Sequence, residues 1–107
     1  MLKYEITIPS GSNESTSLVL KLSSQCVIGL EIPASITAAS FTIQGKGADG
    51  QWKDLQLNDV DYEVAAAGNI IQPLRPDVMA AAREVRVLGD TNEGADRSLY
   101  FVVRDIN

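Results

Sequence analysis

The sequence predicts an all-β protein, a single antiparallel β-sandwich of jelly-roll type with about eight short strands and one short helix. Apolar and polar residues alternate over short segments, as in strands with one buried face. Clusters of Gly, Pro, Asn and Asp separate these segments at spacings typical of sandwiches and barrels. The chain has 107 residues, of which 45% are hydrophobic and 21% charged, so we expect one domain over residues 1–107.

Segments with the pattern of strands in the first half are residues 2–8, 16–22, 25–32 and 41–44. The first alternates strictly, and we expect a half-buried face made of Leu2, Tyr4, Ile6 and Ile8. In the second, the inward residues are Leu18, Leu20 and Leu22. The third is almost continuously apolar, as in a strand covered on both faces, and its Cys26 is predicted to be a buried hydrophobic residue.

The predicted strands of the second half are residues 52–57, 62–65, 70–71, 84–88 and 97–104. Alternation is imperfect in the first of these, which indicates a bulge. Residues 75–82 (RPDVMAAA) predict the one helix. Proline suits the first helical position, Asp77 suits the positive end of the helix dipole, and the alanines favour propagation.

The composition excludes several kinds of chemistry. The chain has no histidine and one cysteine, so a Ser-His-Asp or Cys-His apparatus is excluded and a zinc site lacks ligands. A net charge of −5 disfavours nucleic acid or an anionic membrane as partner. We expect no signal peptide and no membrane span. The sequence therefore predicts no catalytic residue, no metal, no cofactor and no enzymatic activity.

Acidic residues are numerous enough for a glycosidase pair or a calcium site, but they fall in or beside predicted turns. Aspartate in turns usually accepts hydrogen bonds from the backbone. Residues 58–61 (NDVD) and 90–93 (DTNE) have the residue types of a calcium loop without its twelve-residue pattern. We interpret both runs as solvated turns.

Two aromatic residues are the candidate ligand-stacking residues, Trp52 and Tyr62. A tryptophan beside a Gly/Asp loop can stack on a sugar or a base, and Tyr62 is near in sequence. The alternative is that Trp52 closes the open end of the sandwich core. Since few other aromatic residues accompany it, we favour the second interpretation.

Residues 32–40 (IPASITAAS) and 64–71 (VAAAGNII) are rich in small apolar residues without strict alternation. Such segments suit packing against a neighbouring subunit. They also suit tight loops that close the core. The sequence leaves these two interpretations open.

An ordered series of signals extends from Thr16 to Ile106. The apolar strand ends in GLEIPA, FTIQG and DGQWKDL follow, and then come VMAAAREVRVLG and ADRSLYFVVRDI. In this order the chain resembles small virion structural proteins of tailed bacteriophages, which decorate the head or belong to the tail. The piece ending in DGQW is also similar to galactose-binding-like sandwich modules.

The virion resemblance implies a non-enzymatic structural protein, most simply a capsid decoration or cement protein that stabilises the particle by binding its shell. Its partners would be other virion proteins, either the major capsid protein or tail proteins, and further copies of itself in a homo-oligomer such as a trimer. It would be made in the host bacterial cytoplasm and located in the virion. The second resemblance implies an alternative, a carbohydrate-binding attachment module of a phage tail or fibre.

Overall fold

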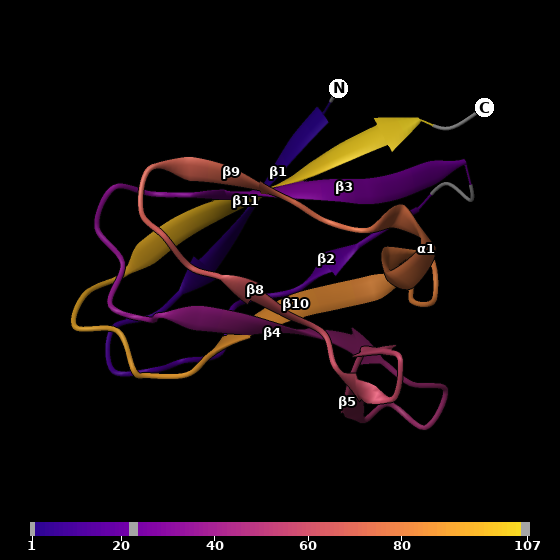
Figure 1. Ribbon diagram of the computed structural model, residues 1–107, viewed down its shortest axis with the longest axis horizontal. Helices are drawn as coiled ribbons and strands as arrows, with labels where there is room; N and C mark the ends of the chain where they lie inside the picture. Colours follow the sequence, from indigo (N-terminus) through magenta and orange to yellow (C-terminus); the bar gives the residue numbers. More distant parts are fainter. Residues whose placement is uncertain (1, 22–23, 106–107) are drawn as a thin grey trace.

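Two antiparallel sheets face each other in the computed structural model, which describes residues 2–21 and 24–105 (Figure 1). In order across the first sheet lie β1 (Leu2–Ile8), β11 (Arg97–Asp105), β3 (Gln25–Ile32) and β9 (Ile70–Pro73). The second sheet has the order β2 (Leu18–Val19), β10 (Glu84–Gly89), β4 (Ser40–Lys46) and β5 (Trp52–Asp54), with β8 (Glu63–Ala65) also paired to β4. The predicted all-β sandwich is confirmed.

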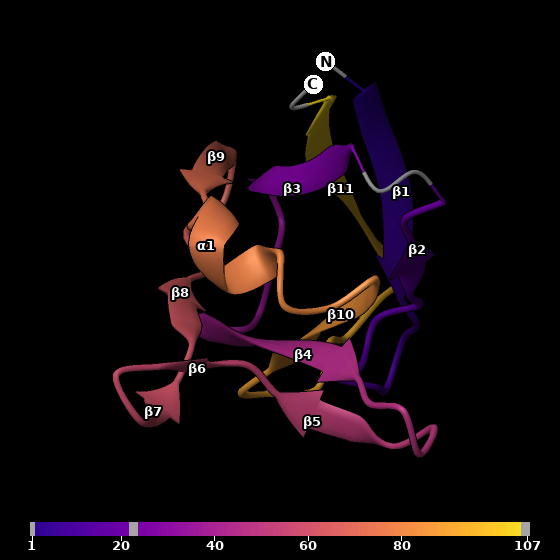
Figure 2. The same cartoon turned by 90° about the vertical axis from the view of Figure 1, so that its right-hand side faces the viewer.

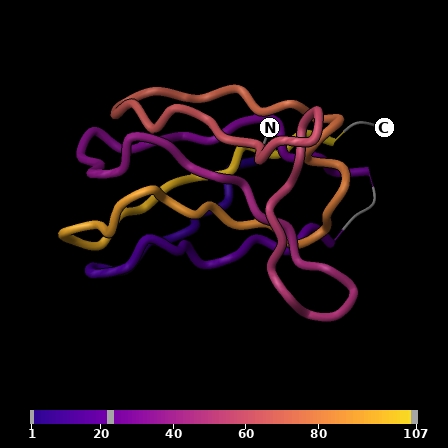
Figure 3. The backbone as a smooth tube through the Cα atoms, turned by 60° about the horizontal axis from the view of Figure 1, so that its bottom comes forward, coloured from indigo at the N-terminus to yellow at the C-terminus, as the bar shows by residue number. Residues whose placement is uncertain are grey.

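The strand pairs are nested along the chain. β1 pairs with β11, β2 with β10, β3 with β9, and β4 with β8, all antiparallel. Successive pairs alternate between the two sheets, as when a long hairpin is rolled up, and this is the jelly-roll topology. A small hairpin of β6 (Gln56–Leu57) and β7 (Val60–Asp61) is inserted together with β5 between β4 and β8. The turn that joins β4 to β5 projects from the body of the molecule (Figure 3).

The core lies between the sheets and is built from alternate residues of the long strands. β4 contributes Phe41 and Ile43, and β11 contributes Leu99, Phe101 and Val103, each at most 1% exposed. Burying side chains of this size stabilises the fold by about 1.5–3 kcal/mol each. The alternation of residues 41–44 therefore agrees with the observed inward face of β4, whereas the sequence analysis named no inward residues for β11.

Only part of the face predicted for β1 is buried. Ile6 and Ile8 are 0% exposed, whereas Leu2 is 51% and Tyr4 36% exposed. Tyr4 borders a cleft that it shares with Leu18, Val19 and Leu20, so this part of β1 stays partly open to solvent. Leu18 and Leu20 are buried as predicted, and the prediction for Leu22 lies outside the described residues.

The predicted helix is present but shorter than residues 75–82. α1 spans Pro76–Met79, and the chain then leaves the helix through bonds from Ala81 to Val78 and from Ala82 to Met79. Figure 2 shows α1 beside β9 and β8, across the sandwich from β1 and β2. Val78 and Met79 are buried there, so the helix covers the core where the two sheets separate.

Cys26 is buried beneath this helix, 3% exposed, with its Sγ 3.7 Å from the carbonyl oxygen of Pro76. Burial raises the pKa of its thiol above the ordinary value. The thiol is therefore kept neutral, and the prediction of a small buried hydrophobic residue is confirmed.

One buried carboxylate holds the loops together at the end of the sandwich away from β5. Glu93 is 1% exposed and accepts hydrogen bonds from the N–H groups of Thr37 (2.8 Å) and Ala38 (2.9 Å) and from Arg97 Nε (3.0 Å). Its own backbone bonds to Gly11 and Ser12 in the loop after β1. The interpretation of residues 90–93 as a solvated turn is therefore wrong at Glu93, because three loops converge on that residue.

The donors around Glu93 also set its ionisation. Burial alone would raise the pKa of this carboxyl, but the backbone N–H groups of Thr37 and Ala38 and the guanidinium of Arg97 together hold it below its ordinary value. Because the folded pKa is the lower one, the stabilisation is complete above the unfolded pKa of about 4.3. It is lost as the pH falls through the folded pKa.

We expect Glu93→Gln to lower the free energy of unfolding by roughly 1–3 kcal/mol, because an amide replaces one acceptor oxygen with a donor that faces buried N–H groups. Urea unfolding at pH 7 measures this, with Glu63→Gln on the exposed side of β8 as the control. Below about pH 4 the difference between the variant and the unmodified protein should narrow, since protonation removes the same charge. An unchanged stability in Glu93→Gln would contradict the structural role of this carboxylate.

Candidate functional site on the outer face of the second sheet

Trp52 lies on the outer face of the second sheet, turned away from the core. Strand pairing places it opposite Lys46, and the neighbouring pairs on this face are Asp54 with Gln44 and Gln44 with Arg86. Phe41 and Ile43 of the same strand β4 point inward. The residues around Trp52 therefore come from three adjacent strands, β5, β4 and β10.

Two cations approach the indole ring. The guanidinium carbon of Arg86 is 4.4 Å and the Nζ of Lys46 5.5 Å from the ring centroid. At these distances both interact with the negative face of the π-system, and arginine is the commoner partner. Trp52 is half-buried by these neighbours.

A polar chain fixes Arg86 in this position. Arg86 Nε donates to Gln44 Oε1 (2.8 Å), and Gln44 Nε2 donates to Asp54 Oδ1 (2.7 Å). A terminal nitrogen of Arg86 lies 3.5 Å from Glu14 Oε2, and the side chain of Arg86 is only 14% exposed. The guanidinium is therefore compensated within the chain.

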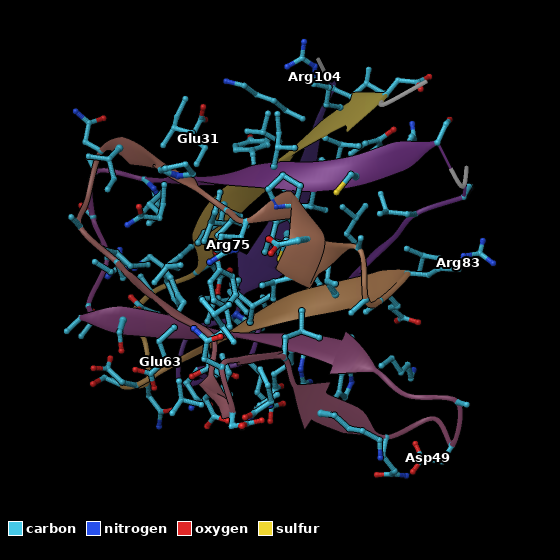
Figure 4. All side chains as sticks on the ribbon, turned by 45° about the vertical axis from the view of Figure 1, so that its right-hand side comes forward. Glu31, Asp49, Glu63, Arg75, Arg83 and Arg104 are labelled. Atoms are coloured by element: carbon cyan, nitrogen blue, oxygen red, sulfur yellow. The ribbon has the colours of Figure 1, made fainter. Side chains whose placement is uncertain are left out.

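The adjoining charges are paired in the same way. Lys46 Nζ lies 3.9 Å from Glu84, which also accepts a hydrogen bond from Ser17 Oγ (2.7 Å). At the tip of the β4–β5 turn, Asp49 accepts the N–H of Gln51 and pairs with Lys53, which lowers the pKa of Asp49. Figure 4 shows Asp49 at this projecting tip. Asp49 thus serves the turn, as the sequence predicts for aspartates in such loops.

Tyr62, the second candidate stacking residue, does not join Trp52. It is 7% exposed and belongs to the core, and its hydroxyl accepts the backbone N–H of Arg75 at 2.9 Å. Its ring offers no surface to a ligand, and the proposed pair of exposed aromatics is not formed. Tyr62 directly precedes β8 (Glu63–Ala65) and lies on the same side as Val64, which pairs with the buried Phe41.

The favoured interpretation of Trp52 is also corrected. Trp52 does not close the open end of the core, because it lies on the outer face of an edge strand. In place of the bulge predicted within residues 52–57, the segment divides at Leu55 into β5 and β6, and Leu55 packs against the core. The sequence reasoning missed Arg86 and Gln44, which the pairing of β10 with β4 brings to Trp52.

The two small-residue segments meet each other. The N–H of Asn69 donates to the carbonyl of Pro33, and that of Ala66 donates to Ala39. A Cβ on Gly68 would lie 2.6 Å from the carbonyl oxygen of Ala34, so this contact requires a glycine. The segments are tight connecting loops, although part of each is exposed.

A second surface, on the outer face of the first sheet, was missed by the sequence reasoning. Val102, Gly29 and Pro73 are neighbours across β11, β3 and β9, and Lys3 of β1 completes the row. The shallow hollow here has a volume of about 480 Å³ and is lined by Lys3, Ile28, Gly29, Ile71, Pro73 and Val102. The consecutive apolar residues of the last strand, LYFVV, are the signal that could have revealed a strand with two apolar faces.

Within residues 2–21 and 24–105, no three Cys, Asp or Glu side chains converge in a way that could hold a metal ion. The same residues include no helix with the length and apolarity required to cross a membrane.

Comparison with known proteins gives no match: no protein-family model, no curated protein and no solved structure is significantly similar to this chain.

We expect Trp52→Ala to lower the free energy of unfolding by about 1 kcal/mol, because the variant loses the cation–π contacts with Arg86 and Lys46 but no core packing. Phe41→Ala, which empties a fully buried site, should cost roughly 3–5 kcal/mol. Thermal or urea unfolding of the two variants provides the comparison. Equal losses would show that Trp52 carries core packing that its outward position does not provide.

Proposed function

We propose that this chain is a non-enzymatic structural subunit, a capsid decoration or cement protein of a tailed bacteriophage that stabilises the virion by binding its shell. The observation that supports this role best is the apolar surface on the outer face of the first sheet. Ile71 is 56% exposed there, beside Pro73 and Ile28. Outer faces of sandwiches usually carry polar residues, and an apolar patch with a polar rim is typical of a protein contact.

The rim of this surface is charged but balanced. Lys3 Nζ and Glu31 Oε1 are 2.6 Å apart at its margin, both partly exposed. Figure 4 shows Glu31 on the outside of the first sheet. A neutral rim around an apolar centre suits docking on a protein shell, since no net charge has to be removed from water.

The topology agrees with this role without determining it. Jelly rolls occur in viral capsid domains and also in lectins, so fold alone does not assign function. The paired charges around Trp52 support a structural subunit further. Arg86 and Gln44 are both engaged within the chain rather than directed toward a ligand.

We expect Ile71→Asp to abolish binding to the shell while leaving the fold intact, since Ile71 is exposed. The measurement is co-sedimentation of the purified chain with empty head shells assembled from the major capsid protein of the same genome. Val60→Asp is the matched control, because Val60 is another β-branched residue, 64% exposed, on the distant β6–β7 hairpin. Failure of the unmodified chain to pellet with head shells or with tails would overturn the proposal.

A carbohydrate-binding attachment module is the second candidate. Trp52 supports it, because its partly exposed ring lies beside the exposed carboxylate of Asp54, and sugar sites combine aromatic and polar groups. Two observations argue against a carbohydrate site: the guanidinium of Arg86 already stacks on the indole ring of Trp52, and Tyr62 is buried.

Fluorescence separates the two candidates, because Trp52 is the single tryptophan. For a structural subunit we expect no change in emission when neutral and acidic oligosaccharides are added. If a saturable change in emission disappears in Tyr62→Phe, which alters a buried hydroxyl, the change is unrelated to stacking of a sugar on Trp52. If the change is retained in Tyr62→Phe and lost in Asp54→Asn, it would establish the carbohydrate role.

A further inference from the structure

The outer edge of β1 is the longest open sheet edge among the described residues. β1 has seven residues and pairs on one side only, with β11. The other edges are protected: β2 is two residues long, β5 and β8 are interrupted by an insertion, and β9 ends at Pro73. An unprotected edge strand presents backbone groups that can pair with another strand.

The direction of these backbone groups follows from Thr7. Its carbonyl accepts the N–H of Thr16 and its N–H donates to Thr16 Oγ1, so the backbone of Thr7 faces away from β11. Backbone groups alternate along a strand, and those of Glu5 and Lys3 therefore face the same open side. Thr16 occupies the edge at Thr7, so the backbone N–H and C=O groups of Lys3 and Glu5 remain open for pairing with another strand.

We propose that β1 pairs antiparallel with β1 of a second copy of this chain about a two-fold axis at Tyr4, which joins the first sheets of two subunits into one continuous sheet. In this register Lys3 is hydrogen-bonded opposite Glu5 of the partner subunit, and Glu5 opposite Lys3 of the partner subunit. The side chains of both residues lie on the outer face, so two opposite-charge pairs form across the junction.

Charge selects this register over its neighbours. An axis at Lys3 would place two lysines opposite each other, and an axis at Glu5 would oppose two glutamates and meet the edge already occupied by Thr16. Glu5 is exposed and forms no ion pair with a described residue, so it is available to a partner. Lys3 already pairs with Glu31 of its own chain at 2.6 Å, and its ammonium group would be shared with Glu5 of the partner subunit. The edge of β1 is thus complementary to the same edge of a second copy, because Lys3 and Glu5 carry opposite charges on either side of Tyr4.

The apolar residues of this corner agree with a covered edge. Leu2, Tyr4 and Val19 are 51%, 36% and 47% exposed, half of the large hydrophobic residues that the described surface exposes. Tyr4 also lines a cleft of about 560 Å³ with Leu18, Val19 and Leu20. Figure 2 shows β1 and β2 together at this side of the sandwich. Pairing at Tyr4 would bring the two tyrosines together on the inner face, where β2 leaves them uncovered.

The oligomeric state of three charge variants tests this pairing, and the test does not depend on the proposed function. Sedimentation equilibrium of the unmodified chain up to about 1 mM should show a dimer. Lys3→Glu and Glu5→Lys should each weaken dimerisation by about tenfold or more, because each creates two like-charge pairs. Glu63→Lys makes the same change of net charge as Glu5→Lys on another sheet and should dimerise normally.

Mixing provides the decisive comparison. In an equimolar mixture of Lys3→Glu and Glu5→Lys chains, opposite charges face each other again, and we expect a mixed dimer to form. Recovery in the mixture also shows that each variant is folded. A monomer at every concentration, a trimer, equal dimerisation of all variants, or no recovery on mixing would each overturn the pairing.

Discussion

The antiparallel pairing of β11 with both β1 and β3 is the constraint on which the rest of the jelly roll depends. β11, the last strand of the chain, is nine residues long and pairs with β1, the first strand, on one side and with β3 on the other. Once this register is set, its inward residues Leu99, Phe101 and Val103 face Phe41 and Ile43 across the core. The pairs β2–β10, β3–β9 and β4–β8 are nested inside this pair along the chain.

Polar contacts complete the structure where strands cannot. At one end Glu93 replaces a missing strand partner for the N–H groups of Thr37 and Ala38, and Arg97 balances its charge. Among the described residues, no buried side-chain nitrogen or oxygen lacks a hydrogen-bond partner. A buried carboxylate is acceptable here because its desolvation is offset by three donors.

The surfaces of the sandwich divide into engaged and open regions. The outer face of the second sheet is a closed network in which Trp52, Arg86 and Gln44 satisfy one another. The outer face of the first sheet is apolar at its centre, and the edge at β1 keeps backbone groups unpaired within the described chain. These open regions are adjacent, since Lys3 belongs to both, and both contacts that we propose therefore use the first sheet.

The sequence by itself determined the jelly-roll class, the approximate positions of the longer strands and the burial of Cys26, because these follow from the local period of two and from turn chemistry. It did not predict β7, which lies in a run interpreted as a solvated turn, or the restriction of β2 to Leu18–Val19. Only the tertiary structure decided the roles of Glu93, Trp52, Tyr62 and Arg86. Glu93 looks like a turn residue in sequence, and its burial depends on two loops more than fifty residues away in the chain. Such contacts join residues far apart in sequence, and a local pattern carries no information about which distant segment will cover it.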